Sequence, residues 1–256
     1  LLIATAWPAS WLHMGILGQY AFFPLWLGYI LLADAVVFRR RGNSIITHRP
    51  LEFCGMFLAS VPIWWTFEVF NTFTQNWHYL GGEQYSSWQY ALVASWHFSI
   101  VVPAVFETAS LVGTFNIVER VRQRTIVVLP SFSLIGLVGL GILSLGATVL
   151  WPTYAFSLTW LCLVLILDPI NYRLGAPSII GHLQRGDWRI LITFGIGALI
   201  CGWFWEMWNF WAYAKWEYSI PFVGFVHLFE MPLLGYGGYL PFGLEVFTAY
   251  HFLKWA

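Results

Sequence analysis

Apolar residues occur in long runs that alternate with short polar segments. A transmembrane helix needs about 20 mostly apolar residues. The run at residues 1–16 is short, and because the sequence does not begin with Met we expect its first part to be missing. The other runs cover residues 20–38, 51–73, 99–118, 127–150, 154–172, 188–213 and 239–255. The pattern predicts an all-α polytopic membrane helix bundle of about eight spans.

The composition supports a membrane protein. Hydrophobic residues make up 59% of the 256 residues and charged residues only 9%, whereas soluble proteins carry about 25% charged residues. This excludes a soluble secreted domain, a disordered chain and a typical nucleic-acid binder. Membrane lipid is therefore an expected partner and nucleic acid is not. The three cysteines lie in apolar runs, so we expect neither a disulfide framework nor a cysteine metal site.

Basic residues are concentrated in three of the loops. Eleven of the 12 Lys and Arg residues lie in segments 39–49, 120–124 and 173–189 or at Lys254, and only Lys215 lies on the other side. With eight spans these segments share one face, which the positive-inside rule assigns to the cytoplasm. We expect a protein of the bacterial inner membrane with both termini cytoplasmic.

Two long aromatic connections lie on the opposite face, at residues 74–98 and 214–238. Both contain glycine pairs, and the second also contains prolines. Backbone of this kind can lie at membrane depth only when it packs against protein or water. We therefore expect interfacial or re-entrant caps over the bundle and not ordinary lipid-exposed helices.

The two parts of the chain resemble each other. DAVVFRRRGNSIITH at residues 34–48 matches DPINYRLGAPSIIGH at residues 168–182, and Trp26 matches Trp160 at the same offset of 134. The match indicates a tandem duplication with halves at residues 1–120 and 121–256. Each half holds four predicted spans, an even number. The halves should therefore share one topology and be related by a pseudo-twofold axis along the membrane normal.

Four carboxyl groups and two amides recur at matching positions, further along the repeat at an offset of 138. They are Glu68, Asn71 and Glu107 in the first half and Glu206, Asn209 and Glu245 in the second. The two glutamates of a half are 39 residues apart in both halves (107 − 68 and 245 − 206). Intramembrane carboxylates usually face the bundle interior, so we expect all four to converge near the axis.

This quartet has two interpretations. Buried carboxyl groups can act as general acids, and surrounding aromatic rings can stabilise a developing cation, which together indicate a catalytic site. The rings expected to bind the substrate are Trp65, Trp77, Trp205, Trp208, Trp216 and Tyr218. Alternatively, the Glu and Asn side chains only hydrogen-bond the helices together. The residues alone leave both interpretations open.

A second duplicated group lies on the basic face. It comprises Asp34, Arg39 and His48 with their mates Asp168, Arg173 and His182. An Asp five residues before an Arg at a helix end predicts a local ion pair, and Ser-Ile-Ile-x-His predicts a loop packed under the bundle. The spacing matches no metal-site signature, so we expect no metal and assign this group a structural role.

The sequence resembles the integral-membrane lycopene cyclase domain family over about half of its length. The resemblance lies in Glu206…Asn209…Trp216-Glu217-Tyr218…Pro241…Glu245 and in the matching stretch Glu68…Asn71…Trp77-His78-Tyr79…Pro103…Glu107. In the family an acidic pair follows the proline closely, whereas here a single Glu follows four residues later. The resemblance implies tandem helical repeats and a proton-initiated cyclisation of a carotenoid, without net redox change.

Three functions fit these observations. The first is a membrane enzyme that cyclises or isomerises a carotenoid or another isoprenoid. The second is a non-catalytic subunit of a larger membrane complex, in contact with partner subunits and binding lipid, pigment or quinone. The third is a transporter, which parallel repeats favour. No nucleotide-binding or hydrolase motif occurs, and the sequence leaves the identity of any cofactor unknown.

Overall fold

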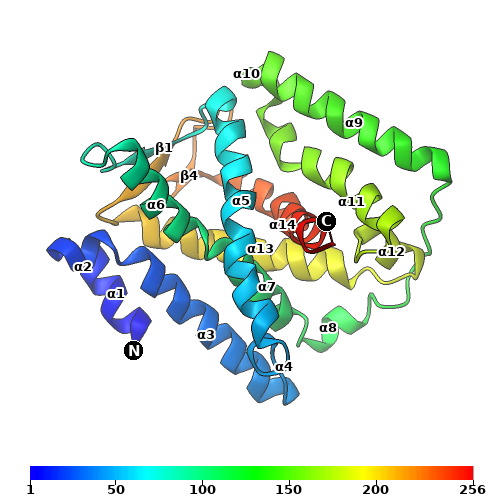
Figure 1. Ribbon diagram of the computed structural model, residues 1–256, viewed down its shortest axis with the longest axis horizontal. Helices are drawn as coiled ribbons and strands as arrows, with labels where there is room; N and C mark the ends of the chain where they lie inside the picture. Colours follow the sequence, from blue (N-terminus) through cyan, green and yellow to red (C-terminus); the bar gives the residue numbers. More distant parts are fainter. Residues whose placement is uncertain (256) are drawn as a thin grey trace.

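The computed structural model describes residues 1–255 and is mostly helical (Figure 1). The helices of the first half are α1 (Leu2–Trp11), α2 (Gly15–Gln19), α3 (Phe22–Arg41), α4 (Ile45–His48), α5 (Pro50–Thr74), α6 (Ser87–Phe98), α7 (Val101–Val112) and α8 (Asn116–Glu119). Those of the second half are α9 (Ser131–Leu150), α10 (Pro152–Ala155), α11 (Cys162–Leu174), α12 (Ile179–Gln184), α13 (Arg189–Phe210) and α14 (Tyr239–Trp255), with 3-10 helices η1 (Phe156–Trp160) and η2 (Leu233–Gly238).

Six helical segments within residues 1–255 are long and apolar enough to cross a membrane, consistent with an integral membrane protein. Four are α3, α5, α9 and α13, and two are composite: Ser87–Val112 and Pro152–Leu174. The predicted count of eight is not reached on these criteria. The first run is divided into α1 and α2, each shorter than a bilayer crossing, and α14 has 17 residues.

One predicted cap is partly wrong. Residues 87–98, expected within a cap, form α6, which leads into α7 through a short turn at Ser99 and Ile100. Ser86 and Gln89 form a capping box that starts this helix, a signal that satisfies the first free backbone N–H groups. Residues 214–238, in contrast, contain no α-helix, which agrees with the prediction that they are not an ordinary lipid-exposed helix.

The duplicated segment on the basic face forms the same local structure twice. In the first half, α3 ends at Gly42 in the left-handed region, and α4 follows with Ser44 as its N-cap. In the second half, α11 ends at Gly175, also left-handed, and Ser178 caps α12. Glycine is favoured at this position because a side chain strains the left-handed conformation.

The predicted ion pairs in this segment are wrong. Asp34 accepts hydrogen bonds from Ser44 Oγ at 2.9 Å and from the Ile46 N–H at 3.1 Å. Asp168 accepts from the N–H groups of Ile179 and Ile180 at 2.7 and 2.9 Å. Each carboxylate thus holds the N-terminus of the short helix after it, where free N–H groups favour a negative charge.

Four helices, α5, α7, α13 and α14, lie in the middle of the molecule (Figure 1). Helices α1 and α3 flank one side of this group, and α9 and α11 flank the other. Helix α13 packs along α7 and α14. Close approach to α7 requires a glycine, since a Cβ at Gly197 would lie 2.9 Å from the backbone nitrogen of Ala109.

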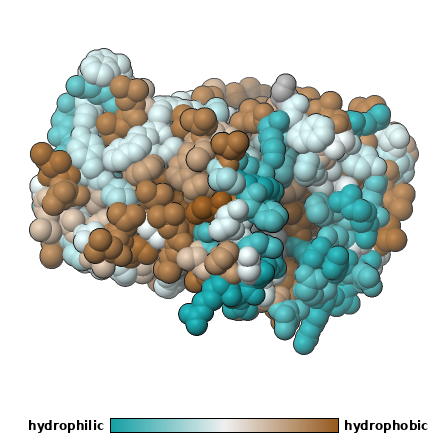
Figure 2. All heavy atoms as spheres, turned by 60° about the horizontal axis from the view of Figure 1, so that its bottom comes forward, coloured by the Kyte–Doolittle hydropathy of each residue, from teal (hydrophilic) through white to brown (hydrophobic). Residues whose placement is uncertain are grey.

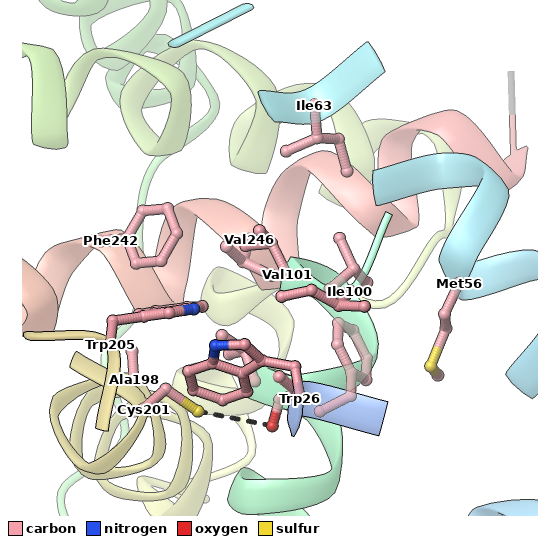
Figure 3. Close-up of a cluster of buried hydrophobic side chains, with 14 of the residues drawn as sticks. Trp26, Met56, Ile63, Ile100, Val101, Ala198, Cys201, Trp205, Phe242 and Val246 are labelled. Carbon is pink, nitrogen blue, oxygen red and sulfur yellow. Dashed lines mark hydrogen bonds between the residues drawn. The ribbon is translucent and has the colours of Figure 1, made fainter. Parts of the chain in front are cut away.

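Large rings from each half insert into the other. Fully buried Trp26 packs against Trp205 at a ring-centroid distance of 5.0 Å (Figure 3). Its ring also packs against that of Trp208, at 5.0 Å. Its repeat mate Trp160 packs against Phe67 at 5.4 Å and Trp77 at 6.1 Å. Aromatic burial supplies a large part of core energetics, so these crossed contacts hold the two halves together.

The basic loops adjoin one another. Arg41 donates to the Gly113 carbonyl, and the Arg124 N–H donates to the Gly186 carbonyl at 3.0 Å. We call this region, comprising the loops around α4, α8 and α12, the basic end. Figure 2 shows hydrophilic residues gathered in one region of the surface, with much of the remainder hydrophobic.

The opposite end carries strands, which an all-α prediction does not include. Strands β1 (Trp77–Leu80) and β2 (Lys215–Tyr218) form an antiparallel pair, which we call the ribbon. A second small sheet joins β3 (His227–Leu228) to β4 (Met231–Pro232). The ribbon connects the two halves directly.

Candidate functional site

A cavity of 370 Å³ lies beneath the ribbon, between the two halves. This volume is within the range of about 300–1,000 Å³ that is usual for small-molecule sites. Fifteen of the 37 lining residues are Phe, Trp or Tyr, and both halves contribute to the lining. The lining rings include Trp77, Tyr79 and His97 from the first half and Trp216, Tyr218 and Tyr239 from the second.

The first carboxyl site is built around Glu68, near the end of α5. Its Oε1 atom accepts hydrogen bonds from Tyr79 Oη at 2.6 Å, Trp64 Nε1 at 2.8 Å and Trp77 Nε1 at 3.2 Å. All three donor side chains line the cavity. Glu68 therefore lies directly behind the cavity wall.

Asn71 positions the strand that carries two of these donors. Its Nδ2 donates to the Trp77 carbonyl at 2.8 Å, and its Oδ1 accepts from the N–H groups of Asn76 and Trp77 at 2.9 and 3.2 Å. The amide therefore fixes the turn from α5 into β1. As a result Tyr79, two residues further on, lies over Glu68.

The second carboxyl site repeats this plan around Glu206. This side chain is fully buried, and its Oε1 accepts hydrogen bonds from Tyr218 at 2.7 Å and Tyr239 at 2.6 Å. Trp216 Nε1 donates to the Tyr218 hydroxyl at 2.8 Å. Asn209 binds the N–H and carbonyl of Trp216 at 2.9 and 2.7 Å, as Asn71 does for Trp77.

The register of the ribbon brings the two sites together. Trp77 pairs with Tyr218, and Tyr79 pairs with Trp216. Alternate residues of a strand face the same side, so all four rings face the cavity. Between them, His78 pairs with Glu217 and both are exposed. One cavity is thus bordered by a phenol–carboxyl pair from each half.

Both ribbon tyrosines are protonated and act as hydrogen-bond donors. Burial raises the pKa of Tyr79 well above its usual value, and the neighbouring Glu68 raises it further. Burial and then Glu206 raise the pKa of Tyr218 in the same way. Each phenol therefore keeps its proton at neutral pH and directs it at the carboxyl group. Each phenol oxygen also accepts an indole N–H, from Trp64 for Tyr79 and from Trp216 for Tyr218, and keeps one further lone pair that can accept a proton.

The other two glutamates do not join these sites. Fully buried Glu245 accepts a hydrogen bond from the Leu163 N–H at 3.1 Å, in the first turn of α11. Fully buried Glu107 lies close enough to Asp34 to interact with it electrostatically. Neither lines the cavity.

The spacing along α5 and α7 shows how far apart the carboxyl groups of one half lie. Ser60 Oγ contacts the Phe98 carbonyl at 2.5 Å and the Val102 N–H at 3.1 Å, which sets the level of α5 against α7. Glu68 lies eight residues along α5 in one direction and Glu107 five residues along α7 in the other. At 1.5 Å per residue the axial separation is about 20 Å. The predicted convergence of all four glutamates is therefore wrong.

Most of the aromatic residues expected at the site line the cavity. Trp77, Trp205, Trp208, Trp216 and Tyr218 do so. Trp65 does not, because its Nε1 donates to Ser95 Oγ at 2.9 Å on another face of α5. Helical spacing explains the error: adjacent residues such as Trp64 and Trp65 point about 100° apart.

The sequence-based set lacked many of the lining residues, among them Tyr79, Trp160, Tyr239 and His97. Tyr79 is the repeat mate of Tyr218, and Trp160 is the repeat mate of Trp26, so the duplication contained a signal for both. Tyr239 and His97 have no mate of their own type. No sequence pattern marked these two residues.

Within residues 1–255 no group of three or more His, Cys, Asp or Glu side chains is arranged to hold a metal ion. Comparison with protein-family models, with curated proteins and with solved structures found no match to this chain. The geometry of the cavity is therefore the basis for assigning a function.

Proposed function

We propose that this protein is a membrane enzyme that binds an isoprenoid in the aromatic cavity and isomerises or cyclises it by proton transfer. One observation carries the proposal: Tyr218 and Tyr239 line the cavity while both donate hydrogen bonds to the buried Glu206. Phenols in contact with a buried carboxyl group provide a route for a proton between that group and a bound ligand.

The proposed reaction conserves electrons. Full burial disfavours a charge on Glu206, so this carboxyl group is suited to hold a proton. Through a phenol it protonates one carbon of a ligand double bond, and the π electrons form the new C–H bond. A neighbouring C–H bond then gives its electrons to a new double bond, and its proton returns to Glu206 through the phenols. The aromatic wall stabilises the intervening cation.

We also propose the duplicated architecture that the sequence predicts. Halves at residues 1–120 and 121–256 are related by a pseudo-twofold axis through the His78–Glu217 pair. The register supports this axis, because a twofold rotation about that pair exchanges the Trp77–Tyr218 pair with the Trp216–Tyr79 pair. The basic end faces the cytoplasm of a bacterial cell, with both termini on that side and eight spans. Cysteines placed at Asn43 and Gln123 should be labelled only from the cytoplasm, and those at Gln75 and Glu217 only from outside. Labelling of position 123 from outside contradicts this topology.

The enzymatic function is tested by separating binding from turnover. The protein is purified from its native membrane, the bound lipids are extracted with organic solvent, and the isoprenoid found is supplied to protein in nanodiscs. The double variant Tyr218→Phe/Tyr239→Phe keeps both rings but removes both hydroxyls. We expect it to retain the ligand and to lose turnover by about 100-fold or more.

Glu83→Gln is the matched control, because Glu83 is exposed in the loop beyond β1. It should leave both binding and turnover unchanged. Equal turnover by the double variant and the wild type contradicts the proposed proton route through Tyr218 and Tyr239. Absence of turnover by the wild type itself, with the ligand still bound or with partner subunits co-purifying, contradicts the enzymatic proposal and supports the non-catalytic subunit instead.

A further inference from the structure

The two segments that follow the ribbon strands differ in polarity. Strands β1 and β2 are antiparallel, so the segments that follow them leave the ribbon at opposite ends. The segment after β1 contributes Tyr85, Tyr90 and His97 to the lining. The segment after β2 contributes Val223 and other apolar residues. The segment after β1 therefore brings polar side chains to the cavity, whereas the segment after β2 brings only apolar ones.

The difference is clearest at one pair of repeat positions. His97 and Gly235 are related by the 138-residue offset of this part of the repeat, and both line the cavity. Gly235 leaves no side chain, and Met231 Sδ occupies the space beside it. The imidazole of His97 therefore has no polar counterpart at the matching position of the second half.

His97 has an unused hydrogen-bonding atom. Its ring lies 5.5 Å from that of Phe22, and its Nε2 is buried with no hydrogen-bond partner in the described part of the chain. The nearby hydroxyl of Tyr85 is already engaged: it accepts from Gln19 Nε2 at 2.5 Å and donates to Tyr20 at 3.1 Å. Buried polar atoms almost always have partners, so His97 is suited to bind a group that enters the cavity.

Charge limits what that group can be. Lys215 is the only lysine or arginine among the lining residues that the structure describes. Its Nζ is paired with Glu230 and with Glu217, the latter at 3.5 Å. No unpaired cation is therefore offered to a phosphate or a carboxylate. The His97 side of the cavity fits an uncharged oxygen, such as a hydroxyl or a carbonyl.

We propose that the ligand of this cavity is an isoprenoid with one oxygenated, uncharged end, and that His97 Nε2 hydrogen-bonds that oxygen. The inference rests on the proposed function and adds the chemical class of the ligand and the orientation in which it lies in the cavity. The oxygenated head lies at the His97 end, and the hydrocarbon tail extends past the ribbon to the Gly235 end.

Two probes of closely similar carbon skeleton test the inference. Phytol and phytane differ in the terminal hydroxyl and in one double bond. Each is titrated into the protein in nanodiscs, and binding is followed by tryptophan fluorescence, since tryptophans line the cavity. We expect the wild type to bind phytol about fivefold to tenfold more tightly, as one hydrogen bond allows.

His97→Phe should bind both probes equally, with phytane affinity within twofold of the wild type. His97→Gln, which retains a polar group, should restore part of the preference for phytol. His227→Phe is the matched control, because His227 is exposed in β3 and lies outside the cavity lining. It should behave as the wild type.

The outcomes separate this inference from the proposed function. Equal affinity of the wild type for the two probes, or an equal loss of both in His97→Phe, overturns the inference and leaves cavity binding intact. Absence of any specific fluorescence change with either probe overturns cavity binding and the inference together. A preference for phytol that His97→Phe does not alter shows that another residue binds the oxygen, which also overturns the inference.

Discussion

The sites around Glu68 and Glu206 share one plan but differ in their donors. Glu68 accepts from two indoles and one phenol, whereas Glu206 accepts from two phenols. An indole N–H can only donate, while a phenol both donates and accepts. Only the Glu206 site can therefore relay a proton through either of two side chains. The two halves therefore share the buried carboxyl acceptor but differ in the side chains that donate to it.

An exchange at two repeat positions produces part of the difference. Trp64 corresponds to Gly202, and Val101 corresponds to Tyr239, both at the 138-residue offset. A Cβ at Gly202 would overlap the ring of Tyr239. The tyrosine thus occupies space in the second half that is available because no tryptophan stands there. Each site fills the volume beside its carboxyl group from a different helix.

The largest expected effect is the difference between the two glutamates. Glu206→Gln should lower turnover of the extracted isoprenoid by about 100-fold or more, because the amide keeps the shape but cannot supply the proton. Glu68→Gln should lower it by less than about 10-fold, since two of its three donors are indoles. Turnover assays on protein in nanodiscs measure both. Equal losses would mean that one site is shared across the two halves.

The exchange of donors can be reversed by mutation. Gly202→Trp alone places an indole where the Tyr239 ring lies, and we expect a loss of about 3 kcal/mol or more in the free energy of unfolding, at the upper end of overpacking effects. Adding Tyr239→Val should recover most of that stability but not the turnover. Thermal unfolding in detergent checks the stability. A double variant as unstable as the single one would show that the two positions do not compensate.

The asparagines should differ through their burial. Asn209 is 1% exposed, whereas Asn71 is only partly buried. Asn209→Ala leaves the backbone groups of Trp216 unpaired in a buried place and should cost about 2–3 kcal/mol. Asn71→Ala should cost about 1 kcal/mol, because water can replace part of its bonding. Chemical unfolding monitored by tryptophan fluorescence gives both values, and a larger cost at Asn71 would contradict this ranking.

The smallest effect is expected at the basic end, which serves as a reference for both sites. Arg189 binds Asp187 at 2.8 Å and Glu119 at 2.8 Å, joining the two halves. The Arg189 guanidinium holds the pKa of Asp187 well below its usual value. Asp187→Asn should therefore cost about 1 kcal/mol at neutral pH.

The sign of the pH dependence follows from the lowered pKa. The contribution of Asp187 is fully present above the unfolded-state pKa of about 3.9 and is lost as the pH falls toward the lower folded-state pKa. The stability difference between wild type and Asp187→Asn should thus be constant from pH 7 to about pH 5 and then shrink. Unfolding measured across this range checks it. A difference that grows as the pH falls would rule out this ion pair as its source.

Local patterns in the sequence determined much of this molecule. Long apolar runs predicted most of the helices, because a helix that faces lipid must be apolar along its whole length. Repeat matching singled out Asp34 and Asp168, Glu68 and Glu206, and with them their asparagines. Both members of each pair occupy the same local structure, since the same short-range hydrogen bonds form wherever the same spacing of residues recurs.

Tertiary packing decided the rest. Equal spacing of Glu68–Glu107 and Glu206–Glu245 did not bring the four groups together. In the first half Glu107 lies about 20 Å from Glu68 along antiparallel helices, and in the second half Glu245 bonds the start of α11 instead of joining Glu206 at the cavity. Tyr239 and His97 reach the cavity only because of how α14 and α6 lie against the ribbon. Distances across a bundle depend on how far each helix is shifted along its axis and how it is rotated about that axis. Both are set by the packing of side chains from distant segments, so no single stretch of sequence contains them.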